Sequence, residues 1–244
     1  MKKYYEMLSK RLSIRKKVDG LNITSDDLDK VKKVIEQSKY LYDYKLEWEI
    51  VDIKETNSKI GEYAICIYSD VDNENKYLVN IGYIFEQVDL LLEENNIGVC
   101  WLGIPRPNKK ELNGLKYAIM LGLTKINEDS LRKEISDFKR KDYLWDGDFD
   151  EDVIKMSMLA PSACNSQPWN VIYKDNIITV YRNKKVKTII PRSFIKYYNN
   201  IDMGIYLCFL ESCLDYKNYK YERKLYSEEL DDNNYIKIAE YYLK

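Results

Sequence analysis

The order of predicted elements repeats once along the chain, and this repetition constrains the fold more than any other feature. Apolar residues at helical spacing, after a Thr-Ser-Asp-Asp start signal, predict a helix over 25–41. Segments rich in β-branched and aromatic residues predict strands over 46–53 and 63–69. A long, deeply buried helix is expected over 77–96, and a strand or tight loop over 98–104.

The second half of the chain has the same order. An acidic start precedes the first helix there, and the expected elements are a helix at 153–160, strands at 170–174 and 176–183, a long helix at 197–214 and a final strand at 234–243. The two long helices share an Asn-Ile-x-x-x-Ile spacing, from Asn80-Ile81 to Ile84 or Phe85 and from Asn200-Ile201 to Ile205. A period of about 120 residues is far longer than a solenoid repeat, so it favours two fused copies of one unit; chance similarity of element order is the alternative.

The predicted halves are 1–130 and 131–244. The expected fold class is α+β, in which each half has a mainly antiparallel sheet packed by helices around a long central helix. Near the boundary, 108–115 is predicted to be a short polar helix.

The segment 159–170, LAPSACNSQPWN, contains two of the chain's five prolines and several short polar residues. A proline after the preceding helix prevents its continuation, and Ser and Asn side chains on a loop donate and accept hydrogen bonds in fixed directions. The pattern is compatible with a binding loop. It is equally compatible with an ordinary helix-to-strand connection whose Trp169 fills the core.

A second candidate motif, Arg11-x-Ser13-x-Arg15, lies near the N-terminus. Two guanidinium groups and a hydroxyl at this spacing suit a phosphate monoester, because Arg offers charge-assisted, bidentate donors. The alternative is a solvated basic surface, since five of the eight residues in 10–17 are cationic.

Three segments together resemble a known family. PSACNSQPW (161–169) resembles the PSSxNxQPW motif of the FMN-dependent nitroreductases, RLSIRKK (11–17) resembles their RxSxR/K motif, and NNIGVCWLG (95–103) resembles their GLGTCWIG segment. In the family the Pro-Ser motif follows the Arg motif closely, whereas 145 residues separate Arg15 from Pro161 here. Duplication explains the spacing, because the first half keeps the Arg motif and the second keeps the Pro-Ser loop. The chain therefore resembles a single-chain branch of the family that imitates the usual homodimer, with a nitroreductase-like fold.

The resemblance implies that FMN binds where the halves meet. The residues implied to contact its phosphate are Arg11, Ser13 and Arg15, with Arg132 and Lys133 as a second basic contact in which Glu134 replaces the usual proline. Those implied for the pyrimidine edge and ribityl chain are Pro161, Ser162, Ala163 and Asn165, with Ala163 in place of the usual serine. The backbone of Leu102 and Gly103 is implied to pass over the isoalloxazine. The chain has parts for one such site, so one FMN per chain is expected.

The implied activity is ping-pong hydride transfer from NAD(P)H, through FMN, to a small-molecule acceptor such as a nitroaromatic or a quinone. The flavin carries the chemistry, so no side chain is assigned a catalytic role and no metal is expected. Two alternatives remain open. The first is a flavin-binding or degenerate protein of the same fold without turnover, and the second is a structural or interaction protein that binds no flavin.

Composition excludes several other classes of function. The 244 residues contain no histidine, which removes Ser-His and Cys-His dyads and His-ligated metals. The five cysteines form no CxxC pair, and phosphate-loop and dinucleotide-binding glycine motifs are missing. A net charge of −1 argues against nucleic acid or an anionic membrane as the main partner. The expectation is a cytoplasmic protein that is monomeric because it is already a pseudo-dimer.

Overall fold

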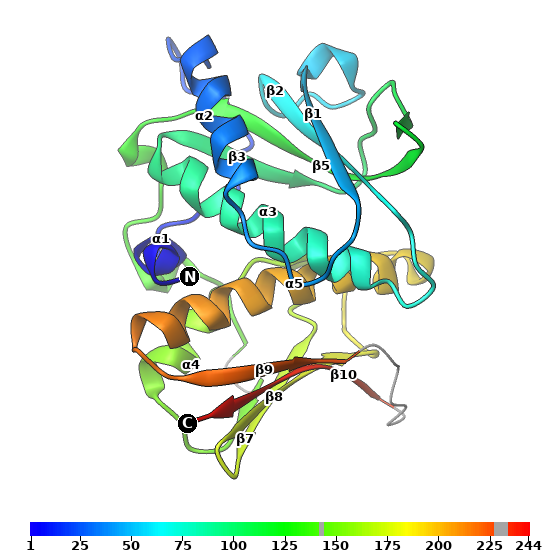
Figure 1. Cartoon of the computed structure of the whole chain (residues 1–244). Helices are drawn as coiled ribbons and strands as arrows, with labels where there is room; N and C mark the ends of the chain where they lie inside the picture. The colour runs from blue at the N-terminus through cyan, green and yellow to red at the C-terminus, as the bar shows by residue number, and fades with distance from the viewer. Residues whose placement is uncertain (142–143, 227–233) are drawn as a thin grey trace.

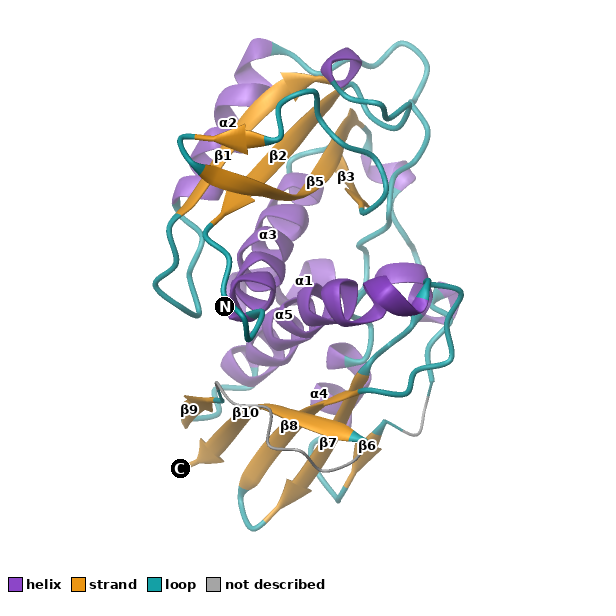
Figure 2. Cartoon of the chain, turned by 90° about the vertical axis from the view of Figure 1, so that its right-hand side faces the viewer, coloured by secondary structure: helices purple, strands orange, loops and turns teal. Residues whose placement is uncertain are grey.

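The computed structural model describes residues 1–141, 144–226 and 234–244. Two mainly antiparallel sheets lie at opposite ends of the molecule, and two long helices cross between them (Figures 1 and 2). The first-half elements are the 3-10 helix Lys2–Tyr4, α1 (Tyr5–Leu8), α2 (Ser25–Glu36), β1 (Leu46–Asp52), the 3-10 helix Ile53–Glu55, β2 (Tyr63–Ser69), α3 (Lys76–Glu94), β3 (Ile97–Leu102), β4 (Glu111–Leu112) and β5 (Leu115–Lys125). The later elements are the 3-10 helices Glu128–Ser130 and Ile135–Asp137, β6 (Trp145–Asp146), α4 (Glu151–Ser157), the 3-10 helix Ala163–Asn165, β7 (Trp169–Lys174), β8 (Ile177–Asn183), α5 (Arg192–Tyr216), β9 (Tyr221–Leu225) and β10 (Tyr235–Leu243).

The two sheets have equivalent strand orders. One runs β1-β2-β5-β3 and the other β7-β8-β10-β9. In each set of four the strand that comes last in the chain, β5 or β10, lies between the two strands that precede it. The short strand β4 pairs with β5, and β6 adds to β7 in parallel. This arrangement confirms the expected fold class of two fused half-units. The division at residue 130 stays a prediction.

The two long helices cross at a pair of glycines. A Cβ on Gly82 would lie 2.0 Å from the carbonyl oxygen of Ile201, and a Cβ on Gly204 would lie 1.9 Å from that of Val79. Each glycine thus meets the backbone three residues before its counterpart, which is a reciprocal contact. Only glycine permits this approach of two helix backbones.

The glycine pair also corrects the register of the repeat. Gly82 and Gly204 are 122 positions apart. At that spacing the counterpart of Asn80 is Asp202, so the alignment of Asn80 with Asn200 is wrong by two residues. The register of the repeat is set by the backbone contact between the two helices, and the short Asn-Ile pattern does not report that contact.

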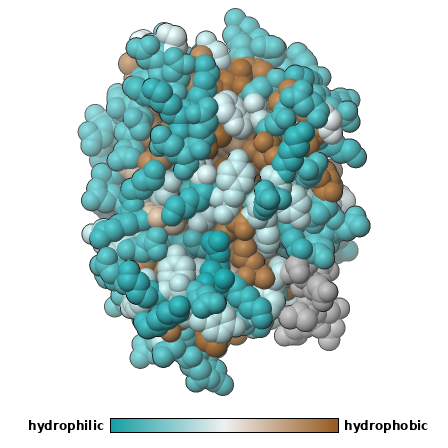
Figure 3. Space-filling view, viewed as in Figure 1, coloured by the Kyte–Doolittle hydropathy of each residue, from teal (hydrophilic) through white to brown (hydrophobic). Residues whose placement is uncertain are grey.

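One continuous apolar core spans both halves. On the first-half side Val31 and Ile35 of α2 are buried, and on the second-half side Val153 of α4 is buried. Trp169 at the start of β7 is fully buried and stacks on Tyr206 of α5 with ring centroids 4.8 Å apart. Burial of this apolar surface is the main stabilising contribution. The face drawn in Figure 3 is largely hydrophilic, with smaller apolar areas between polar residues.

Several local predictions differ from the structure, since α4 ends at Ser157 instead of residue 160 and α5 begins at Arg192 instead of residue 197. The helix expected to reach residue 41 begins at the predicted capping box, formed by Thr24 and Asp27, but ends at Glu36. The short helix expected over 108–115 is wrong, because Asn113 and Gly114 both adopt positive φ, 49° and 85°, and form the turn between β4 and β5. An Asn-Gly pair with two positive φ angles is the preferred two-residue hairpin turn.

The N-terminal segment of the first half docks on α5 of the second. The Met1 amino group lies 2.9 Å from Asp215 Oδ2, and the rings of Tyr5 and Tyr216 stack with centroids 3.7 Å apart. The N-terminal residues therefore contact the second half, and the chain then passes to the first half, where Arg11 lies. None of the helices within the described residues is both long and apolar enough to span a bilayer.

Candidate functional site

The Arg segment, defined as residues 11–15, lies beside β3. The Ile14 N–H donates to the Val99 carbonyl at 2.9 Å. A Cβ on Gly98 would meet the Ile14 side chain at 2.5 Å, so glycine at this position allows the close approach. Burial raises the pKa of Cys100, and the nearby Arg15 opposes that shift. The two first-half motifs are thus brought together.

Arg11 is buried, with 3% of its surface exposed, and is paired inside the protein. Its Nη2 lies 2.8 Å from Asp89 Oδ2, and its Nε lies 3.5 Å from Glu86 Oε1. Nη2 also donates to Ser13 Oγ at 3.3 Å. Burial lowers the pKa of Arg11, but the attraction of Asp89 and Glu86 outweighs it, so the pKa is raised. The Arg11 charge is therefore largely compensated within the chain.

Three buried carboxylates share one face of α3. Glu86, Asp89 and Glu93 follow helical spacing, and burial raises the pKa of each above its usual value. For Glu86, repulsion from Asp89 adds to burial, and Asp202 of α5 contributes further. Trp101 Nε1 donates to Glu86 Oε2 at 3.1 Å. The α3 carboxylates therefore connect the Gly-Val-Cys-Trp-Leu-Gly segment to Arg11 and to α5.

Asp202 holds the Pro-Ser loop, defined as residues 161–168. Its Oδ1 accepts from the Ala163 N–H at 2.9 Å, and its Oδ2 accepts from Ser166 Oγ at 3.3 Å. Burial raises the pKa of Asp202 to about 8, although these two hydrogen bonds oppose the shift. Within the loop, Ser162 Oγ accepts from the Gln167 N–H at 2.9 Å. The loop is anchored to α5 by a carboxylate that burial favours in its neutral form.

The backbone of the Pro-Ser loop is strained. Cys164, Asn165 and Gln167 have φ of 49°, 54° and 49°, a region that side chains other than glycine rarely occupy. Each such residue costs on the order of 1 kcal/mol, and such strain gathers at ligand-binding sites. The surrounding contacts hold the loop in a conformation that it would not adopt alone.

Three arginines connect the Arg segment to the Pro-Ser loop, and we call Arg11, Arg132 and Arg140 the arginine cluster. Arg132 Nη1 donates to the Arg11 carbonyl, and Arg140 Nη1 donates to Asn165 Oδ1 at 3.0 Å. The guanidinium carbons of Arg132 and Arg140 lie 4.1 and 5.2 Å from the ring centroid of Phe138. Burial, then repulsion from Arg11 and Arg132, lowers the pKa of Arg140 to about 10. Its Nε is buried and has no hydrogen-bond partner among the described residues.

The remaining predicted residues are placed as follows. Lys133 is exposed and pairs with Asp129 at 3.0 Å, and it lines an open groove of about 840 Å³ beside Arg132. Leu102 is buried at the end of β3. The Gly103 carbonyl accepts from Tyr198 Oη of α5 at 2.7 Å, and a Cβ on Gly103 would lie 2.8 Å from the Tyr198 ring. A second-half aromatic side chain therefore covers this glycine.

Sequence reasoning did not identify Arg140, Asp202 or Tyr198. Arg140 lies between Lys139 and Lys141, and nothing in that basic run separates it from its neighbours. Asp202 carried a usable signal, because a carboxylate inside the mostly apolar stretch 201–210 of a long helix is costly to bury without a partner. Tyr198 is one of 23 tyrosines and carried no distinguishing signal.

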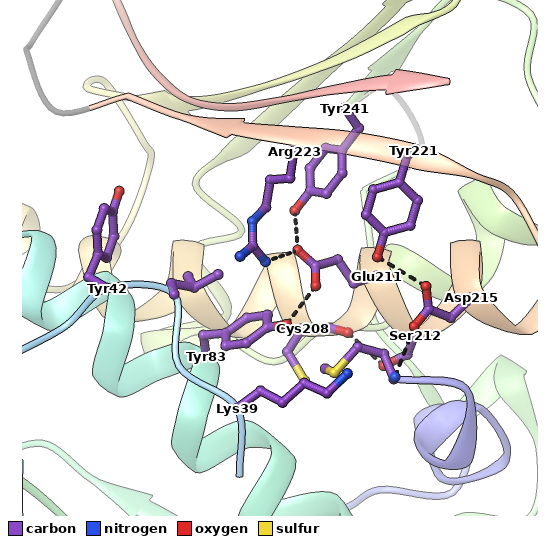
Figure 4. A network of polar contacts seen from close by, with 12 residues as sticks. Lys39, Tyr42, Tyr83, Cys208, Glu211, Ser212, Asp215, Tyr221, Arg223 and Tyr241 are labelled. Carbon is purple, nitrogen blue, oxygen red and sulfur yellow. Dashed lines mark hydrogen bonds and ion pairs between the residues drawn. The ribbon is translucent and has the colours of Figure 1, made fainter. Parts of the chain in front are cut away.

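We call the region around Asp202, the Pro-Ser loop and the arginine cluster the first junction. A second junction, related to it by the repeat, lies on the other side of the helix crossing. There Asn80 Oδ1 accepts from the Leu41 N–H at 2.8 Å, and Leu41 precedes Ala163 by the same 122 positions. Glu211, the counterpart of Asp89, pairs with Arg223 at 2.6 Å. Figure 4 shows Glu211 also receiving hydrogen bonds from two tyrosines. These donors are Tyr83 Oη at 2.5 Å and Tyr241 Oη at 2.9 Å.

Comparison with solved structures supports the fold. A putative nitroreductase from Thermotoga maritima MSB8 aligns at a TM-score of 0.62 with 20% identity, covering 98% of this chain and 93% of that one. A nitroreductase family protein from Clostridium novyi NT aligns at a TM-score of 0.41 with 18% identity, over 54% of this chain and 89% of that one. An FMN-dependent nitroreductase from Clostridium difficile R20291 aligns at 0.41 with 18% identity, over 50% and 86%.

A search of curated proteins gave no significant match. The described residues contain no cluster of His, Cys, Asp and Glu suited to a metal ion. A scan of protein families matches residues 3–213 to the family described as "Putative TM nitroreductase". Since this match spans most of the 244 residues, the chain belongs to that nitroreductase family of oxidoreductases.

Proposed function

We propose that this chain is an FMN-dependent oxidoreductase that transfers hydride from NAD(P)H to a nitroaromatic, a quinone or a similar acceptor. The observation that carries the proposal is the arginine cluster, which joins the first-half Arg segment to the second-half Pro-Ser loop. Ligand sites commonly form where two units meet. The pairing of the two halves within one chain supports a monomer as the working unit.

The residues present fit the phosphate end of FMN. Asp89 and Glu86 compensate the Arg11 charge, but Arg132 and Arg140 have no ion pair with a described carboxylate. The buried Nε of Arg140 is a donor with no acceptor in the part of the chain that the structure describes. A phosphate monoester carries up to two negative charges and would supply both the missing acceptor and the missing counter-charge. Each charge-assisted hydrogen bond contributes about 1.5–3 kcal/mol.

FMN, when bound, supplies the hydride acceptance and donation that this side-chain set does not provide. The chain's own residues hold and orient. Asp202 fixes the Ala163 N–H, and Arg140 fixes the Asn165 side chain, so the Pro-Ser loop presents a rigid polar edge. Tyr198 packs on Gly103 and limits the access of water to that face. A site that works by positioning needs no histidine.

One observation favours a second candidate, a flavin-binding protein of the same fold without turnover. Tyr198 covers Gly103, the position at which the family resemblance expects backbone to face the isoalloxazine. A ring held there by a 2.7 Å hydrogen bond would hinder the stacking of a donor.

The visible spectrum of the purified protein with FMN separates the two candidates. We expect a bound-flavin spectrum that bleaches when NADH or NADPH is added without oxygen and recovers when a quinone follows. A bound flavin that neither nucleotide bleaches would favour the non-catalytic candidate. Protein that stays colourless after FMN addition would refute both.

A further inference from the structure

A basic groove of about 760 Å³ lies at the N-terminal end of α5, beside the segment that leaves β8. We define the basic groove by its lining residues: Arg182, Lys184, Lys185, Val186, Lys187, Arg192, Ile195, Lys196 and Ile236. Among these described lining residues six are cationic, three are apolar and none is acidic. The continuous segment 184–196 has five cationic residues among thirteen and no acidic residue. This concentration of charge stands out in a chain whose net charge is −1.

Not all of these cations are available to a ligand. Arg182, Lys184 and Lys196 already interact within the chain. Lys185, Lys187 and Arg192 are exposed, and their side chains make no hydrogen bond or ion pair with any described residue. Like charges held together repel, and a bound anion would relieve that repulsion. These three side chains are therefore the groups expected to respond to an anionic ligand.

The start of α5 adds a second, independent attraction for anions. This helix has 25 residues, and its N-cap, Pro191, provides no side-chain hydrogen bond to the first turn. The free N–H groups of a helix N-terminus and its dipole favour negative charge. Arg192 and Lys196 of α5 line the basic groove, so the end of the helix and the cations act at the same place.

The shape of the basic groove favours a small ligand. Its volume lies within the range of small-molecule sites, and Val186, Ile195 and Ile236 give it an apolar floor. A membrane or a nucleic acid needs an extended basic surface, which the overall charge does not provide. Phosphate groups attached to a nucleoside combine the anionic and apolar character that the groove presents.

We propose that the basic groove binds the phosphates of a 2′-phosphorylated dinucleotide, so that NADPH is the preferred donor. The donor role rests on the proposed function. Lys196 in the basic groove and Asp202 behind the Pro-Ser loop are six residues apart on α5, about 9 Å along the helix axis. The two residues also lie about 120° apart around the helix, and an extended dinucleotide can follow that path with its phosphates in the groove.

Calorimetric titration tests the binding step without flavin or turnover. The probes are 2′,5′-ADP and 5′-AMP, added to the full-length chain and to the double variant Lys185→Ala/Lys187→Ala. We expect 2′,5′-ADP to bind more tightly than 5′-AMP, and the double variant to bind 2′,5′-ADP roughly tenfold more weakly, because charge-assisted contacts are lost. The matched control, Lys32→Ala/Lys33→Ala on the exposed face of α2, should bind like the original chain.

Three results would overturn the proposal: no binding of 2′,5′-ADP, equal binding of the two probes, or unchanged affinity in the double variant. If the protein turns over, the double variant should also raise KM for NADPH by a larger factor than KM for NADH. A failure to reduce flavin with either nucleotide would refute the proposed function while the titration result stood. Loss of 2′,5′-ADP binding in the double variant and loss of flavin reduction in both the original chain and the variant are therefore separate outcomes.

Discussion

The two junctions beside the helix crossing have the same framework and different contents. On one side Asp202 anchors the Pro-Ser loop through the Ala163 N–H; on the other Asn80 anchors the connection after α2 through the Leu41 N–H. The first junction has the arginine cluster and a strained loop. At the second junction, Arg223 is paired with a carboxylate that two tyrosines also contact.

The comparison shows how a duplicated unit can keep its scaffold and specialise its sites. At the second junction the carboxylate of Glu211 is satisfied by Arg223, Tyr83 and Tyr241 (Figure 4), so the charge of Arg223 is compensated within the chain. At the first, Arg140 Nε is a buried donor that has no hydrogen-bond partner among the described residues. A buried polar group without a partner costs free energy unless a ligand supplies one. We therefore propose a single flavin site, at the first junction.

The largest effect is expected where the two halves are most alike. Gly82→Ala and Gly204→Ala should each destabilise the fold by about 4 kcal/mol or more, because each Cβ would clash with helix backbone. Gly20→Ala is the matched control, since nothing lies within 4 Å of its Cβ and only the positive φ costs, about 1 kcal/mol. Urea unfolding gives the comparison. A large loss at one helix glycine and none at the other would break the reciprocal pairing.

The next effect separates the two paired arginines. Arg11→Ala leaves Asp89 and Glu86 buried without a cation, so we expect a loss of about 3 kcal/mol in the free energy of unfolding. Arg223→Ala should cost less, because 26% of that side chain is exposed and Tyr83 and Tyr241 still donate to Glu211. Urea unfolding of both variants tests the order. If the two variants lost the same free energy of unfolding, the two arginines would not differ as the two junctions predict.

A ligand-binding effect is expected only at the first junction. Arg140→Ala should weaken FMN binding roughly tenfold or more, because a charge-assisted contact is lost. Arg15→Ala should weaken it in the same direction. The quenching of FMN fluorescence on titration measures the Kd, and Lys155→Ala on the exposed face of α4 is the control. Unchanged affinity in Arg140→Ala would remove the arginine cluster from the site.

The smallest effect concerns pH and makes the two anchors alike. The pKa of Asp202 is about 8 in the folded chain and near 4 when unfolded. Between these values the folded state holds a proton that the unfolded state has lost, so the free energy of unfolding falls as pH rises. Asp202→Asn copies Asn80 and should reduce this slope by roughly 1 kcal/mol per pH unit. Unfolding measured from pH 5 to 7.5 would contradict this if both slopes agreed.

Sequence patterns predicted most of the elements because apolar spacing and β-branched residues report burial directly. The long helices and most of the strands follow such patterns, and so does the repeated order. The Asn113-Gly114 turn was missed because the polar residues around it were interpreted as a helix. Strand β9 was missed because its sequence, YERKL, is dominated by charge and only half of it faces the protein. Its pairing with β10 supplies what local propensity does not.

The candidate site was only partly accessible to sequence reasoning. The Pro-Ser loop and the Arg segment were recognisable as ordered strings, and the structure joins them through Arg132 and Arg140. The internal pairing of Arg11 with Asp89 was not predictable, because it depends on how α3 is turned about its axis. The covering of Gly103 by Tyr198 likewise depends on the crossing of α3 and α5. Contacts between distant segments need the register that the glycine pair sets.

The stoichiometry of FMN binding tests the central claim most directly. Protein of known concentration, titrated with FMN and followed by flavin fluorescence, should saturate at one FMN per 244-residue chain. Saturation at two would show that the junction around Glu211 also binds flavin, and it would contradict the account of one retained and one closed site.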